Sequence, residues 1–166
     1  MKKLLGLLML FAFAAVMTHA AENVTTQGTA KAKIIQAATL EKGQTDLDFG
    51  TIVANTNGGT VAVTAAKQAE RTPQNIQVVT ASGFSAGEFK LSNLDTDTTY
   101  HVSVDPSVPL QKAGATDMSA MLTLSAGDDT VHNVTSKTFY VGGTLTVNGN
   151  QTAGQYQGTY NVTVTY

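Results

Sequence analysis

The stretch YQGTYNVTVTY, residues 156–166, indicates the fold class of this chain. Apolar or aromatic residues alternate with polar ones along its whole length, and the side chains of a β-strand alternate between two faces. The apolar face comprises Tyr156, Gly158, Tyr160, Val162, Val164 and Tyr166. This period of two predicts a strand with one face in a core and the other in water.

The same period recurs upstream. Residues 139–147, FYVGGTLTV, form a second long run, and NGN at 148–150 predicts a hairpin between the two runs, because Asn and Gly adopt positive φ at little cost. Shorter alternating runs separated by turn residues occur at 47–49, 61–63, 76–78, 89–91, 100–104 and 122–124. About nine strands at this spacing predict an all-β, antiparallel two-sheet sandwich of Ig-like architecture. The best helix candidate, residues 64–70, is too short to change that class.

The first residues have the layout of a secretory signal. Lys2 and Lys3 precede an apolar run at 4–16, and Thr18-His19-Ala20 offers a cleavage motif. We expect residues 1–20 to be a signal peptide and residues 21–166 to form one β-sandwich domain. A retained membrane anchor is the alternative, although the apolar run is shorter than the roughly 20 residues that a spanning helix needs. No second run of that length follows, so we expect an exported protein without a transmembrane anchor after signal removal, located in the periplasm, at the cell surface or outside the cell.

Composition narrows the possible partners and chemistry. The 10 basic residues include Lys2 and Lys3, so 8 would remain against 12 acidic ones, a net charge of −4 after cleavage. The basic residues are scattered, which argues against nucleic acid as a partner. Cysteine is absent, and this excludes disulfides and thiolate metal sites.

No catalytic, cofactor-binding or metal-ligating residues are assigned, and we expect no enzyme activity. His101 is predicted to lie on the hydrated face of its strand, and no Gly-x-Ser-x-Gly motif occurs. Paired carboxylates at 46/48, 95/97 and 128/129 fall beside a strand or in turns, where Asp is common. No calcium-loop motif is present, so a strong calcium site is not expected. Weak calcium binding at these Asp-rich turns is the alternative that stays open.

Several blocks of sequence carry a family resemblance. They are LDFGTIV at 47–53, GTVAV at 59–63, GFSAGEF at 83–89, VGGTLTV at 141–147 and AGQYQGTYNVTVTY at 153–166. In this order they resemble the bacterial secreted family catalogued as domain of unknown function 4402. A looser resemblance links them to fimbrial subunits of the chaperone–usher kind (pilins), which end in a similar strand with a Tyr near its end. That likeness implies a pilin-like sandwich, self-association or association with other surface subunits, and a periplasmic chaperone as a further partner.

Pilins also begin with a segment that completes the sheet of a neighbouring subunit, and residues 22–34 resemble such a donor strand. Its small or apolar positions are Val24, Gly28, Ala30, Ala32 and Ile34, alternating with polar residues. The alternative is an ordinary first strand that pairs within its own domain. Pilins usually carry a cysteine pair, which this chain lacks.

Two functions therefore stay open. The first is a secreted bacterial surface or fimbria-like structural subunit, with a role in cell adhesion, that assembles by β-strand addition along its C-terminal strand. The second is a monomeric secreted β-sandwich module that binds carbohydrate or matrix. An open sheet edge along residues 156–166 would favour the first.

Overall fold

A computed structural model describes residues 23–166 of the chain. It divides into two units, one ending at Lys33 and one spanning Ile34–Tyr166. All strands lie in the second unit. They are β1 (Thr39–Lys42), β2 (Ile52–Val53), β3 (Gly59–Val63), β4 (Arg71–Gln74), β5 (Gln77–Val78), β6 (Gly87–Ser92), β7 (Tyr100–Val104), β8 (Ser107–Leu110), β9 (Met118–Leu124), β10 (Thr130–Val131), β11 (Ser136–Val147) and β12 (Val162–Thr165).

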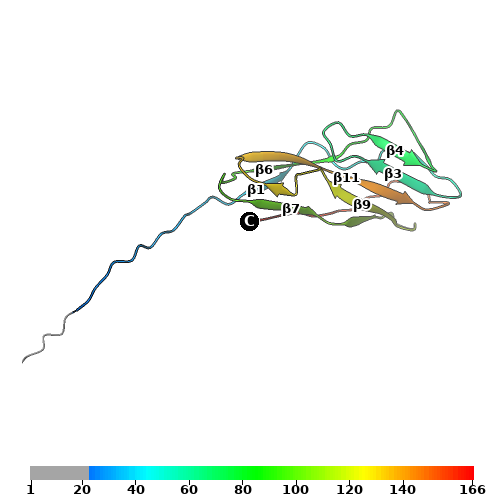
Figure 1. Ribbon diagram of the computed structural model, residues 1–166. Helices are drawn as coiled ribbons and strands as arrows, with labels where there is room; N and C mark the ends of the chain where they lie inside the picture. Colours follow the sequence, from blue (N-terminus) through cyan, green and yellow to red (C-terminus); the bar gives the residue numbers. More distant parts are fainter. Residues whose placement is uncertain (1–22) are drawn as a thin grey trace, which may run out of the picture. The chain divides into compact units, whose positions relative to one another are not determined.

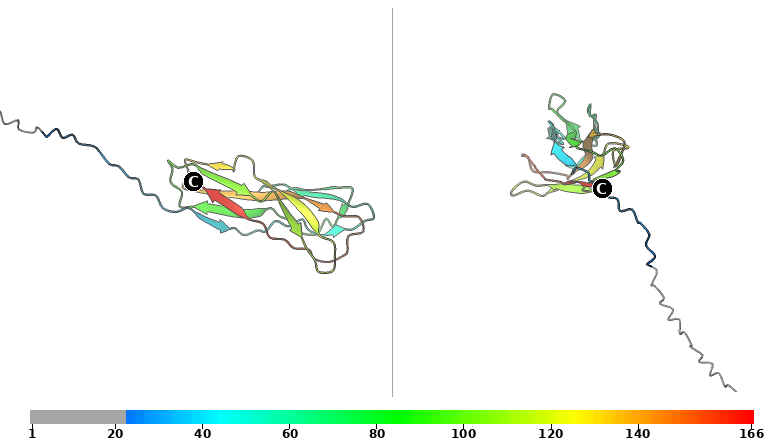
Figure 2. Two further views of the ribbon diagram at one scale, coloured as in Figure 1. Left: turned by 90° about the horizontal axis from the view of Figure 1, so that it is seen from below. Right: turned by 90° about the vertical axis from the view of Figure 1, so that its left-hand side faces the viewer.

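The prediction of an all-β antiparallel sandwich is confirmed. The largest sheet has the order β1-β6-β11-β3-β4, with β9 pairing β11 and β8 pairing β9. A second sheet has the order β10-β7-β12, and β2 and β5 form a small third sheet. Figure 1 shows β7 in a layer apart from β6 and β11, and Figure 2 shows β12, in red, beside the green β7.

Strand β11 is the longest, and it joins the two halves of the large sheet. Its first half pairs with β6 and its second half with β3, while β9 pairs with residues 141–146. Two glycines make this crowding possible, because a Cβ on Gly142 would lie 2.4 Å from the carbonyl oxygen of Val63, and one on Gly143 would lie 2.5 Å from that of Met121. Packing of β3 and β9 around β11 therefore depends on these two side-chain-free positions.

The core has two clusters, one at each end of the sandwich. The first contains Phe49, Val61, Leu145 and Val147, and the second contains Leu91, Tyr100 and Phe139. Of the five residues that the alternation places in the core, Phe49 and Leu145 are buried, whereas Phe89, Tyr160 and Val162 are half-buried.

Three local expectations are wrong. The turn at 148–150 forms, with Asn150 at φ 56°, but no hairpin follows because β12 pairs with β7 and not with β11. The predicted strand at 156–166 begins only at Val162, and before it a single bridge joins Gln157 to Gln111. The helix candidate at 64–70 is a loop, closed by hydrogen bonds from the Glu70 N–H to the Thr64 hydroxyl and from the Thr64 N–H to the Glu70 carbonyl.

Candidate functional site

Strand β12 is an edge strand of its sheet among the described residues. The Asp105 N–H donates to the Asn161 carbonyl at 3.1 Å, and Val162 lies opposite Val104. Because hydrogen-bonding direction alternates along an antiparallel pair, the N–H and C=O groups of Val162 and Val164 point away from β7. They face the side on which no described strand is paired. This edge can therefore accept a further strand.

Three of the other edge strands, β1, β4 and β8, carry features that oppose such pairing. Strand β4 contains Pro73, β8 contains Pro109, and β1 carries Glu41 and Lys42. Proline and charged side chains are common means of blocking an exposed edge. Strand β12, with the sequence VTVT, has neither. Its edge is the unprotected one among these four.

A groove runs beside the segment that precedes β12. It consists of two adjoining cavities of about 770 and 460 Å³, both lined by Leu47, Phe49, Leu110 and Tyr156. One wall is the chain from Asp46 to Ile52 and the other is residues 151–160. Core side chains form the floor, namely Val108, Leu110, Met118, Leu145 and Val147. Apolar core is thus accessible along an open side of the sandwich.

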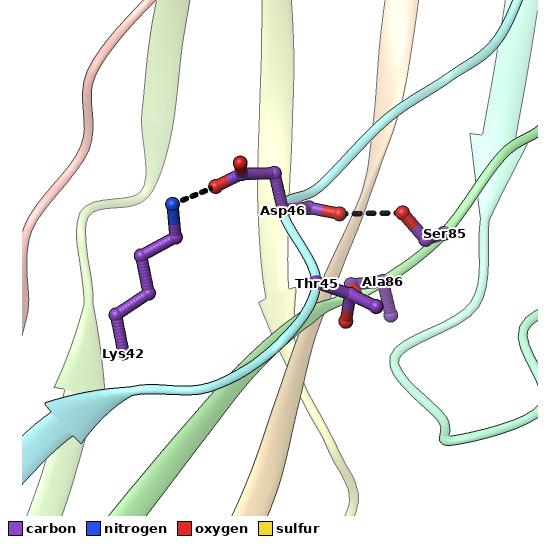
Figure 3. Close-up of polar contacts among 5 residues, drawn as sticks. All are labelled: Lys42, Thr45, Asp46, Ser85 and Ala86. Carbon is purple, nitrogen blue, oxygen red and sulfur yellow. Dashed lines mark hydrogen bonds and ion pairs between the residues drawn. The ribbon is translucent and has the colours of Figure 1, made fainter.

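The first wall is hydrogen-bonded to Ser85 and Ala86, the residues that immediately precede β6. The Asp48 N–H donates to the Ser85 carbonyl at 2.9 Å, and the Ser85 N–H returns a bond of 3.0 Å to the Asp48 carbonyl. Figure 3 shows the neighbouring contacts: the Ser85 hydroxyl donates to the Asp46 carbonyl at 2.6 Å, and Lys42 Nζ lies 2.6 Å from Asp46 Oδ1. The Thr45 hydroxyl donates to the Ala86 carbonyl at 2.8 Å. These bonds fix the start of the wall to residues 85 and 86 and to Lys42.

The second wall is fixed by a buried amide. Gln151 Nε2 donates to the Thr116 carbonyl and, at 2.8 Å, to the Tyr156 hydroxyl, which itself donates to the Thr152 carbonyl at 2.7 Å. Further along, Gly158 passes so close to β8 that a Cβ there would lie 2.1 Å from the Pro109 carbonyl oxygen. The wall is therefore rigidly positioned although it forms no regular strand.

Tyr160 lines the smaller cavity of the groove, and its ring contacts Phe89 edge-on. Burial raises the pKa of the Tyr160 phenol to about 12, and the negative charge of Asp46 adds to the increase. The phenol is therefore neutral at physiological pH and can donate a hydrogen bond into the groove.

The predicted acceptor positions fall into two groups. Tyr156, Gly158 and Tyr160 line the groove, and Val162 and Val164 lie in β12 with half-buried side chains. Tyr166 is exposed, with its ring 5.2 Å from that of Tyr100. The alternation did not identify the opposite wall at 46–52, since the two walls are about a hundred residues apart in sequence. The LDFG block at 47–50, which belongs to that wall, was the available signal.

The predicted donor positions lie in an extended segment. Residues 23–33 belong to no strand and are all exposed, and Val24 and Ile34 are 94% and 95% exposed. Residues 1–22, which include the predicted signal peptide and the first donor residue, lie outside the described part of the chain.

Two further observations concern the described residues only. Residues 23–166 contain no group of three His, Asp or Glu side chains placed to hold a metal ion. Over the same residues, no helix has the length and apolar character required to cross a membrane.

Comparison with known families addresses the part of the chain that builds this groove. The model of the family described as domain of unknown function 4402 matches residues 38–166. The chain belongs to this family. The match to domain of unknown function 4402 covers both groove walls and every strand, and it begins after the donor-like segment 23–34. No curated protein matches the chain.

Proposed function

We propose that this protein is an exported bacterial surface or fimbria-like structural subunit that assembles by β-strand addition. The groove along residues 151–160 and the open edge of β12, which follows that segment, carry the proposal. An added strand there gains backbone hydrogen bonds from the edge of β12 and burial of alternate side chains on an apolar floor. The proposal also accounts for an edge with neither proline nor charge, because assembly would cover it.

The chain supplies a segment with the required pattern. Residues 24–34 present small or apolar side chains on one face, and small side chains suit the narrower cavity of about 460 Å³. Eleven extended residues span about 35 Å, since a strand rises roughly 3.3 Å per residue. Donation of this segment by a second copy would produce a linear polymer.

The test is assembly of the protein as residues 21–166, followed by size-exclusion chromatography with light scattering over a range of concentrations. We expect wild type to form a ladder of oligomers. Ala30→Asp should abolish the ladder, because a carboxylate buried without a partner costs several kcal/mol. The thermal melting of its monomer should match that of the isolated wild-type monomer, since Ala30 is exposed and lies outside every strand.

Thr25→Asp is the matched control, because it adds the same charge to the polar face of the segment. It should assemble as wild type does. A wild type that stays monomeric at all concentrations would contradict the proposal and favour the monomeric carbohydrate- or matrix-binding module instead.

A further inference from the structure

The charges that face the groove are few and are placed in one location. Among the described residues that line it, the charged ones are Asp46 and Asp48. The Asp46 side chain is 75% exposed even though it pairs with Lys42, and Asp48 is also exposed. They are two residues apart, so both carboxylates lie on the outer rim of the same wall.

The donor-like segment has a matching pair of the opposite sign. Within residues 23–34 the charged residues are Lys31 and Lys33, also two residues apart and on the polar face. When the apolar face of this segment enters a groove, both ammonium groups point outward, toward the rim. Two cations and two anions then have the same spacing along neighbouring extended chains.

The two walls give the groove a direction. Residues 46–49 line it together with residues 155–160, whereas Leu40 packs in the same cluster as Val162 and Val164. The wall that continues from β1 therefore runs antiparallel to the wall that leads into β12. A segment entering between them is parallel to one wall and antiparallel to the other.

One orientation satisfies both the charges and the length. With the donor antiparallel to β12, Lys31 and Lys33 lie beside Asp46 and Asp48, and Ile34 reaches the larger cavity next to Phe49. In this register Val24 lies level with Thr39, the first residue of β1, and the donor passes Leu40, which packs in the same cluster as Val162 and Val164. The reverse orientation over the same length brings residue 25 beside Asp48 and the negative Glu22 close to it.

We infer that the occupant of the groove is residues 24–34 of a second copy, aligned antiparallel to β12, with Lys31 and Lys33 paired to Asp46 and Asp48 of the acceptor. The inference rests on the assembly proposed above and adds its direction, register and electrostatic steering. The paired charges attract the two copies before contact and disfavour the reversed alignment.

Cysteine pairs test the direction, because the chain has no cysteine of its own. One variant carries Asp48→Cys and is labelled with ¹⁵N, and the other, unlabelled, carries Lys33→Cys. After mixing and mild oxidation, mass spectrometry should detect a disulfide between one labelled and one unlabelled chain. The matched pair Asp48→Cys with Thr25→Cys should give little of this product. Preferential cross-linking of position 25 would overturn the inferred direction.

Charge reversal tests the steering. Lys31→Glu with Lys33→Glu should slow assembly about tenfold or more at low salt, and the difference from wild type should shrink at about 1 M salt, where charges are screened within roughly 3 Å. Mixing this variant with one carrying Asp46→Lys and Asp48→Asn should restore the rate, since Asn retains the acceptor for the Gly50 N–H. The control Lys67→Glu with Lys90→Glu, at exposed positions elsewhere, should assemble as wild type does.

Failure of the inference is distinguishable from failure of the proposed function. If the variant with Lys31→Glu and Lys33→Glu assembles as fast as wild type, the charge pairing is overturned and strand addition stands. A wild type that never assembles contradicts both.

Discussion

The Tyr160 ring packs edge-on against Phe89, with centroids 6.1 Å apart and ring planes inclined by 64°. Phe89 in turn stacks on Phe139 at 5.7 Å. These three rings join the C-terminal segment to β6 and β11, beside the smaller cavity of the groove. Tyr160 is half-buried and lines the smaller cavity of the groove, and Phe89 is half-buried as well.

The aromatic contacts predict a large effect of removing Phe89. Phe89→Ala should lower the free energy of unfolding by about 3 kcal/mol, the low end for a core Phe, because the side chain is partly exposed. Phe49→Ala, at a buried position, should cost roughly 3–5 kcal/mol. Urea denaturation measures both, and the exposed Lys90→Ala should stay within about 0.5 kcal/mol of wild type. A cost below about 1 kcal/mol at Phe89 would show that its ring contacts contribute little.

The raised pKa of Tyr160 predicts a loss of stability in alkali. The phenol is neutral in the folded protein up to about pH 12, whereas an unfolded Tyr ionises near pH 10. The unfolded state therefore releases its proton first, so the stabilising contribution is complete below pH 10 and is lost as the pH rises toward 12. Tyr160→Phe should remove this part of the pH dependence in thermal melts.

Ultraviolet absorbance titration follows the same group directly, because phenolate absorbs at longer wavelength than phenol. One tyrosine should titrate near pH 12 and disappear from the curve in Tyr160→Phe. Asp46→Asn should move that titration to lower pH, because the carboxylate charge contributes to the shift. An unchanged titration in Asp46→Asn would contradict the proximity of the two groups.

Replacing Gly158 should destabilise the fold for a steric reason. A methyl group there would lie 2.1 Å from the Pro109 carbonyl oxygen and 2.8 Å from a Val108 methyl, so Gly158→Ala must push the wall away from β8. We expect destabilisation of about 1–3 kcal/mol, as for other overpacked sites. Gly83→Ala, where nothing lies within 4 Å of the added methyl, is the control and should be nearly neutral in the same urea titration.

Export should leave a chain that begins at Ala21. The charged start, the apolar run and the Thr18-His19-Ala20 motif all favour cleavage after Ala20. Intact mass and N-terminal sequencing of the exported protein check this. Material from outside the cytoplasm that retains residues 1–20 would disprove it.

The sequence predicted which face of a strand is buried better than it predicted which strands pair with each other. The alternation at 139–147 correctly placed Phe139, Val141 and Leu145 in the core of β11. The same pattern contains no information about which strand lies alongside, so the hairpin expected at 148–150 did not form. Residues 156–161 keep the alternation but form no strand. Residues 156–160 line the groove instead.

The candidate site was only half predictable for a similar reason. Tyr156 and Tyr160 stand out by their period, but Asp46 and Asp48 were interpreted only as a pair of carboxylates beside a strand. Their position on the rim depends on hydrogen bonds between the wall and Ser85, a contact between distant parts of the chain. The isolated sequence carries no signal for such a contact.

The antiparallel pairing of β1 with β6 has a mechanical consequence. Tension applied to the chain ahead of Thr39 in the direction of the β1 axis would act perpendicular to the hydrogen bonds that join β1 to β6. All those bonds, together with the continuation at Gly43, Thr45 and Asp48, would then bear the load at once rather than break one after another. The first strand is thus attached in the geometry that best resists being pulled off.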